Sequence, residues 1–132
     1  MTRHSILVSA LVLSFVMAAL HILSLEFYFY WVYWWYDVAV HFLAGMTGGF
    51  AVYWFIFYSD LFHKRFHTPK HVFAIVLASV MFMGVAWEVF EYIVGTTDSI
   101  EGYHIDTMND LILDGSGAVL AILLSSRKKH NG

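Results

Sequence analysis

The sequence contains no cysteine, a single proline and few charged residues. Without cysteine, the chain has no disulfide, no thiol nucleophile and no thiolate metal ligand. Charged residues make up 13% of the 132 positions and hydrophobic residues 60%, a composition too apolar for a soluble domain of this size. Seven lysines and arginines leave no basic surface for nucleic acid. These absences indicate a protein whose partners are membrane lipids and that binds no nucleic acid.

Four apolar segments have the length of about 20 residues that a bilayer core requires. We expect them at Ser5–Leu25, Asp37–Tyr58, His71–Gly95 and Thr107–Ser126. The connections are short, and no linker or internal repeat marks a second domain. The sequence therefore predicts an all-α fold, in which residues 1–132 form one membrane domain built from a bundle of four transmembrane helices.

The basic residues all fall on one side of such a bundle. They are Arg3, Lys64, Arg65, Lys70, Arg127, Lys128 and Lys129. Because cytoplasmic loops are enriched in lysine and arginine, we expect both the N-terminus and the C-terminus to be cytoplasmic. Residues 1–20, with Arg3 ahead of an apolar run, also fit a cleaved signal peptide, and both interpretations remain open.

Aromatic residues occupy nine of the ten positions from Phe27 to Tyr36, between the first two segments. Amphipathic rings prefer the headgroup level of a bilayer, so this run is typical of an aromatic belt. A stacking platform for a ligand at the outer surface is the alternative interpretation.

Acidic residues are distributed oppositely to the basic ones, since only Asp60 of the ten lies in a predicted cytoplasmic loop. At a rise of about 1.5 Å per residue, all four segments place polar groups about 7–12 Å outward of the bilayer midplane. These groups are His21, His41, Glu88, Glu91 and Asp110. The outer half of the membrane therefore contains one shared polar layer.

The spacing of the polar residues places each set on one side of its helix. Asp37 and His41 are four residues apart, Glu88 and Glu91 are three apart, and Asp106, Asp110 and Asp114 repeat every four residues. An isolated charge near the bilayer centre costs about 3 kcal/mol even on the lenient insertion scale. We therefore expect these side chains to face one another instead of lipid.

Three physical arrangements would satisfy such a layer. A divalent cation fits carboxylates combined with one imidazole, which suit Mg²⁺, Ca²⁺, Mn²⁺, Fe²⁺ or Zn²⁺. The predicted ligands are Asp37, His41, Glu88, Glu91, Asp106 and Asp110, supported by Trp87, Asn109, Asp114 and His21. Alternatively, protonated carboxylates form a proton or cation pathway. In the third arrangement, the hydrogen bonds among these groups only fix helix packing.

A metal in this layer would favour a metal-dependent enzyme. Glu88 or Glu91 would act as general base while the metal polarises a phosphoryl or carbonyl oxygen of a lipid-linked or amphiphilic substrate in the outer leaflet. No serine-nucleophile motif, phosphate-binding loop or dinucleotide fingerprint narrows the reaction further. The same residues would also serve a non-enzymatic subunit that joins a larger membrane complex or forms a homo-oligomer.

Three sequence blocks carry a resemblance to a known family. They read YDVAVHFLAG at 36–45, GVAWEVFEY at 84–92 and DTMNDLILDGSGA at 106–118. In this order they resemble the YjdF-like family of small bacterial inner-membrane proteins of unknown function and, more distantly, the VanZ-like group. The resemblance implies an inner-membrane location and a shared polar site. It implies no reaction. The family's polar positions fall on Asp37, His41, Glu88, Glu91, Asp106 and Asp110.

Overall fold

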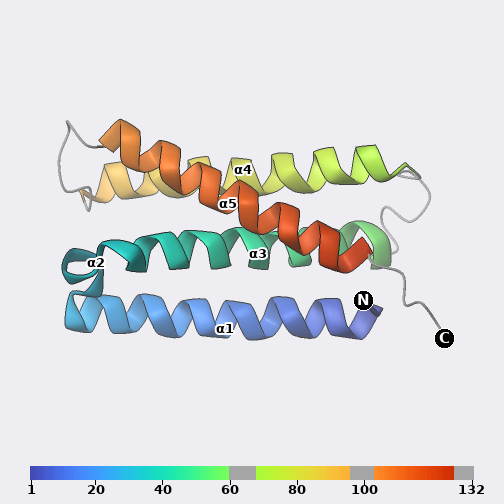
Figure 1. Ribbon diagram of the computed structural model, residues 1–132, viewed down its shortest axis with the longest axis horizontal. Helices are drawn as coiled ribbons and strands as arrows, with labels where there is room; N and C mark the ends of the chain where they lie inside the picture. The colour runs from blue at the N-terminus through green and yellow to red at the C-terminus, as the bar shows by residue number, and fades with distance from the viewer. Residues whose placement is uncertain (60–67, 96–102, 127–132) are drawn as a thin grey trace.

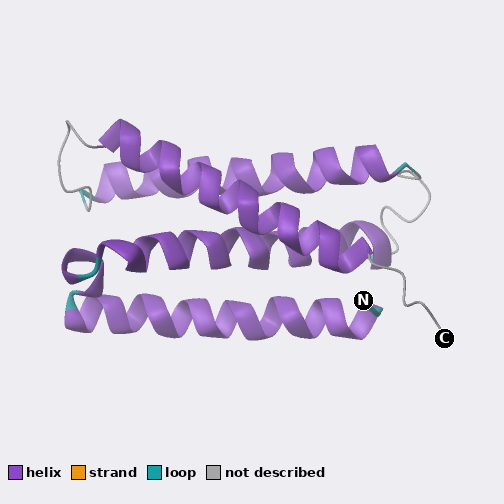
Figure 2. Cartoon of the chain, in the orientation of Figure 1, coloured by secondary structure: helices purple, strands orange, loops and turns teal. Residues whose placement is uncertain are grey.

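The computed structural model describes residues 1–59, 68–95 and 103–126, and all regular structure within these ranges is helical (Figure 2). The helices are α1 (Arg3–Phe27), α2 (Phe29–Val32), α3 (Trp34–Tyr58), α4 (Pro69–Val94) and α5 (Tyr103–Ser126). All except α2, a single turn, are long and apolar enough to cross a membrane. The predicted fold, an all-α protein with four candidate membrane spans, is confirmed.

The long helices begin two to four residues before the predicted spans. Their first residues are Arg3, Trp34, Pro69 and Tyr103, where Ser5, Asp37, His71 and Thr107 were predicted. Hydropathy marks the apolar stretch, whereas a helix begins at its cap. At α4, for example, the Thr68 side chain accepts a hydrogen bond from the backbone N–H of His71, and Pro69 occupies the first turn.

Helix α3 is the centre of the bundle. It packs most extensively against α5 and also contacts α1 and α4, while α5 additionally packs on α4 (Figure 1). In contrast, α1 and α4 do not form an extensively packed pair. The two helices therefore flank α3 without closing over it, and this leaves room for a groove along α3.

The apolar core lies in the half of the bundle where α1 begins and α3 ends (Figure 1). Its buried residues come from all four long helices: Ile6, Ala10, Phe50, Tyr53, Ile56, Val72, Val76, Ala121 and Ile122. We call this the basic end, since Arg3 and Lys70 lie there, and the opposite end the acidic end. The buried polar residues His41, Glu88, Asp110 and Asp114 lie in the other half, toward the acidic end.

The backbones of α3 and α5 approach each other closely at small residues. A Cβ atom added to Gly45 would overlap the backbone carbonyl of Asp114, and one added to Gly117 would overlap the carbonyl of Phe42. Small residues of this kind allow helices to pack in a membrane without intervening side chains. The close approach brings Asp114 of α5 next to the turn of α3 that carries His41.

Candidate metal site and adjoining groove

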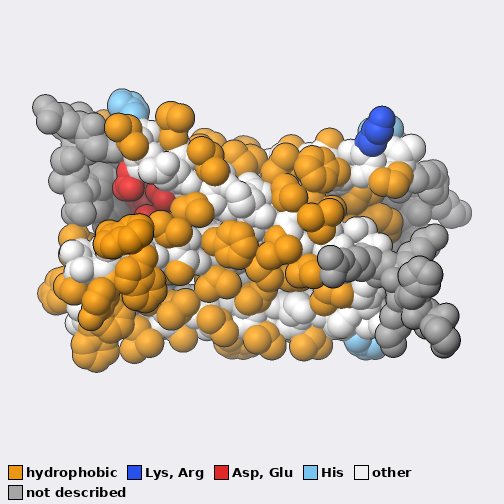
Figure 3. Space-filling model, viewed as in Figure 1, with side chains coloured by type: hydrophobic (Ala, Val, Ile, Leu, Met, Phe, Trp, Pro, Cys, Tyr) orange, Lys and Arg blue, Asp and Glu red, His pale blue; other side chains and the backbone are white. Residues whose placement is uncertain are grey.

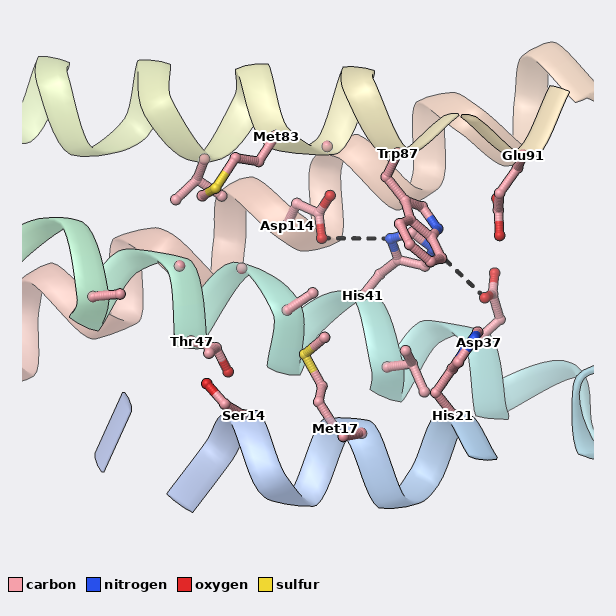
Figure 4. A pocket seen from close by; sticks show the side chains of 18 of the residues that line it. Ser14, Met17, His21, Asp37, His41, Thr47, Met83, Trp87, Glu91 and Asp114 are labelled. Atoms are coloured by element: carbon pink, nitrogen blue, oxygen red, sulfur yellow. Dashed lines mark ion pairs between the residues drawn. The ribbon is translucent and has the colours of Figure 1, made fainter. Parts of the chain in front are cut away.

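The candidate site is centred on the imidazole of His41, which is only 7% exposed. Its Nε2 lies 3.6 Å from Oδ1 of Asp37, one turn earlier on α3, and 3.8 Å from Oδ2 of Asp110 on α5. Its Nδ1 lies 3.4 Å from Oδ1 of Asp114, one turn further along α5. Figure 4 shows His41 between Asp37 and Asp114. One buried imidazole therefore contacts three carboxylates from two helices.

Three of these side chains have the geometry of a metal site. The ligand atoms of Asp37, His41 and Asp110 lie within 4.8 Å of one another. Bonds of about 2.1 Å to a tetrahedral metal separate neighbouring ligand atoms by about 3.4 Å. The distances of 3.6 and 3.8 Å from His41 to the two carboxylates are slightly longer. Small side-chain rotations would therefore bring all three groups onto one ion.

The two glutamates of α4 point in different directions. Three residues turn a helix by about 300°, so Glu88 and Glu91 diverge by about 60°. Glu88 is buried against α5, where its Oε2 accepts a 2.7 Å hydrogen bond from the Thr107 hydroxyl. Glu91 is half-buried, and its carboxylate points toward Asp37 (Figure 4). Glu88 therefore faces α5, whereas Glu91 lines the groove described below.

The aspartates of α5 also separate. Asp110 and Asp114 are buried at His41, whereas Asp106 is exposed. A step of four residues turns the helix about 40° beyond a full turn, so Asp106 is rotated about 80° from Asp114. Asn109, predicted in a supporting role, is exposed as well. Asp114, predicted in the same role, contacts the imidazole directly.

A groove of about 570 Å³ adjoins the site, between α1, α3 and α4. Polar groups gather at its acidic end: His21, Tyr30, Asp37, His41, Trp87, Glu91 and Asp114. Elsewhere its walls are mainly alanine, glycine, valine and methionine. The hydroxyls of Ser14 and Thr47, which also line it, donate to backbone carbonyls of their own helices. The groove is therefore apolar along most of its length and acidic at one end.

An aromatic rim surrounds the acidic end of the groove. Nδ1 of His21 lies 3.1 Å from the Tyr30 hydroxyl, and the ring of Trp87 packs edge-on against His21. Burial and the nearby charge of Asp37 raise the pKa of Tyr30, so its hydroxyl stays protonated and can donate to His21. In the rest of the aromatic run, most rings are exposed, as in a membrane belt. No spacing in the sequence distinguishes Tyr30 from its aromatic neighbours.

The molecular surface shows the same division of charge. Acidic side chains are visible between the helices at one end of the molecule, and the basic side chain drawn in this view lies at the other (Figure 3). Between them the visible surface is largely hydrophobic, as expected for helices that face lipid.

Comparison with known proteins places the whole chain in one family. No curated protein and no solved structure matches the chain. A family model described as "Predicted membrane protein (DUF2238)" matches residues 2–131. The expectation of a membrane protein from an uncharacterised family is confirmed, while the names YjdF-like and VanZ-like stay predictions. The match covers all four candidate spans and every residue of the site, so the chain belongs to the DUF2238 family of predicted membrane proteins.

Proposed function

We propose that the protein binds a divalent cation such as Zn²⁺, Mn²⁺ or Fe²⁺ through Asp37, His41 and Asp110. The observation that carries this proposal is the meeting of two carboxylates and one imidazole within 4.8 Å, inside the bundle. One imidazole with carboxylates suits these ions better than the all-oxygen sets of Ca²⁺. The metal would use side chains from both α3 and α5, the two most extensively packed helices.

Electrostatics favours a bound ion over a packing network alone. Nδ1 of His41 lies 3.4 Å from Oδ1 of Asp114, and both atoms are buried, so Asp114 adds a third carboxylate to the single imidazole. Within the described residues, Arg3 and Lys70 are the only lysine or arginine side chains, and both lie at the opposite end. One imidazole cannot balance several buried carboxylates, and uncompensated charge in a membrane is costly. A dication supplies the missing positive charge.

The groove beside the site supports a metal-dependent reaction on an amphiphilic molecule. Asp37 and His41 line the groove, whereas Asp110 does not. A metal with three protein ligands keeps a position for water or substrate, and here that position would face the groove. A bound metal supplies Lewis-acid chemistry. Glu91, on the groove wall, is placed to take a proton, whereas Glu88 accepts the hydrogen bond of Thr107 on α5.

A pathway for protons or cations finds less support in the geometry. Such a pathway needs polar groups through the whole membrane. In the basic half, the described residues form the apolar cluster around Phe50 and Val76. The polar groups of the acidic half therefore end at a closed core, as expected for a binding site.

The metal content of the detergent-purified protein tests the proposal. Elemental analysis should find close to one Zn²⁺, Mn²⁺ or Fe²⁺ per chain after equilibration with each ion and removal of excess. Asp110→Asn should weaken binding by at least about 10-fold. Asp106→Asn is the matched control, because it removes the same group one turn away on an exposed position. Equal losses in both variants, or no metal in the wild type, would reject the site.

A further inference from the structure

The groove beside the metal site opens sideways, toward the lipid phase. Its walls belong to α1 and α4, which do not pack extensively against each other, and its floor is α3. Ala18 on one wall and Met83 on the other are both exposed. Because α1 and α4 are membrane spans, the opening between them faces acyl chains. A molecule can therefore enter from within the bilayer.

The dimensions of the groove fit one hydrocarbon chain. Its floor runs along α3 from Asp37 to Val52, which is about 22 Å at a rise of 1.5 Å per residue. A volume of about 570 Å³ over that length gives a mean cross-section of about 26 Å², or a width of about 6 Å. Carbon atoms in contact are about 4 Å apart, so an extended hydrocarbon chain fits along this length.

The side chains along the groove suit a flexible aliphatic occupant. The floor carries small residues, Ala44, Gly48 and Ala51, which keep the space open. Met17 and Met83 stand on the two walls, and methionine adapts its shape to irregular apolar partners (Figure 4). Among the described residues, no charged side chain lines the groove beyond its acidic end.

The charge at the acidic end selects the headgroup. Three carboxylates line the groove there, those of Asp37, Glu91 and Asp114, and no described lysine or arginine lines it. Asp110 and Glu88 are buried beside them, so this end of the groove is strongly acidic. An anionic headgroup would be repelled. A cationic one would be attracted, and the rings of Tyr30 and Trp87 offer it cation–π contacts.

We propose that the groove binds one single-chain membrane amphiphile with an amine headgroup, held against Asp37 and Glu91, with its chain lying along α3 toward Val52. The inference rests on the proposed function in that the headgroup lies beside the metal site. It extends that function by naming the class of ligand.

Native mass spectrometry of the full-length protein, released from phosphatidylcholine nanodiscs, tests the inference. The probes are four molecules with the same sixteen-carbon chain, namely hexadecylamine, hexadecanol, hexadecanoate and hexadecyl phosphate. We expect one hexadecylamine per chain, at least about 10-fold tighter than either anion. Preference for an anionic probe, or two amphiphiles per chain, would overturn the proposal.

Two variants link binding to the groove. Ala51→Phe places a ring on the groove floor and should abolish retention of hexadecylamine. Ala78→Phe is the matched control, since Ala78 is exposed on α4 and does not line the groove. Glu91→Gln should reduce the preference for the amine over the alcohol while leaving the chain site intact. Thermal stability in detergent is measured for both phenylalanine variants, so that binding is compared between equally folded proteins. Equal binding of hexadecylamine by both would overturn the proposal.

The two proposals can fail separately. If the wild type carries no metal and Asp110→Asn still binds the amine, the groove is supported and the metal site is rejected. If the wild type carries a full complement of metal but Ala51→Phe retains as much amphiphile as the wild type, the metal site is supported and the groove is rejected.

Discussion

Nδ1 of His41 and Oδ1 of Asp114 lie 3.4 Å apart, and both atoms are buried in the helix bundle. They meet because α5 passes directly over Gly45, where the absence of a side chain lets the Asp114 backbone approach α3. An imidazole and a carboxylate this close interact more strongly in a membrane interior than at a protein surface. The pair therefore lies where the most extensive helix interface, between α3 and α5, meets the polar site.

The first prediction concerns the imidazole. His41→Ala leaves Asp37, Asp110 and Asp114 facing one another without a base, so we expect it to lower the free energy of unfolding by about 3–5 kcal/mol. Thermal unfolding in detergent measures the loss. His4→Ala, on an exposed position of α1, should change stability by no more than about 0.5 kcal/mol.

A double-mutant cycle identifies the partner of His41. Asp114→Asn should recover part of the stability lost in His41→Ala, because it removes one of the stranded carboxylates. Strictly additive effects of the two substitutions would show that the close approach carries no interaction energy.

The second prediction concerns removal of the metal. A ligand at about 100 times its dissociation constant stabilises the folded state by about 2.7 kcal/mol. Adding Zn²⁺ or Mn²⁺ at that level should raise the melting temperature of the wild type, and chelation should reverse the rise. Asp110→Asn, with binding at least about 10-fold weaker, should show at most about half of this stabilisation, whereas Asp106→Asn should behave like the wild type. A rise of the same size in both variants would indicate binding at the surface.

Hydropathy was sufficient to predict the fold class. Four runs of apolar residues predicted four spans, because a bilayer accepts only helices or closed barrels whose backbone groups are satisfied internally. The ends of the helices were harder to predict, since local capping sets them. Thr2, for example, forms a capping box with Ser5, and α1 therefore starts at Arg3, ahead of the apolar run. The single turn of α2 left no signal among its aromatic neighbours.

The site was partly predictable for a geometric reason. Spacing alone placed Asp37 and His41 on one face of α3, because they are neighbours on the same helix. The choice among the acidic residues of α4 and α5 depends on how those helices are rotated about their axes. That rotation is set by packing, for instance where Gly117 meets the carbonyl of Phe42. Sequence spacing cannot show that Asp114 contacts His41 while Asp106 does not.

The third prediction tests the close packing of α3 on α5. Gly45→Ala should lower the free energy of unfolding by about 1–3 kcal/mol, because its Cβ would overlap the Asp114 carbonyl and force the helices apart. Gly115→Ala is the matched control on α5, where an added Cβ comes no closer than 3.4 Å to Met81. Thermal unfolding should separate the two. The same displacement should weaken metal binding in Gly45→Ala, since it moves Asp110 and Asp114 away from His41.

The last prediction concerns orientation in the membrane. The distribution of lysine and arginine predicts cytoplasmic termini, which would place the metal site and the acidic end of the groove in the outer half of the bilayer. Because the chain has no cysteine, a single introduced cysteine is a unique label. Glu26→Cys marks the acidic end and Ser126→Cys the basic end, both on exposed positions. The unmodified chain is the background control.

A membrane-impermeant maleimide applied to intact cells should label Glu26→Cys, and should label Ser126→Cys only after the membrane is opened. The reverse pattern would place the acidic end in the cytoplasmic leaflet, and the amphiphile would then have to come from that leaflet. The metal ligands and the groove would be unchanged, because their geometry depends on helix packing and not on the direction in which the bundle is inserted.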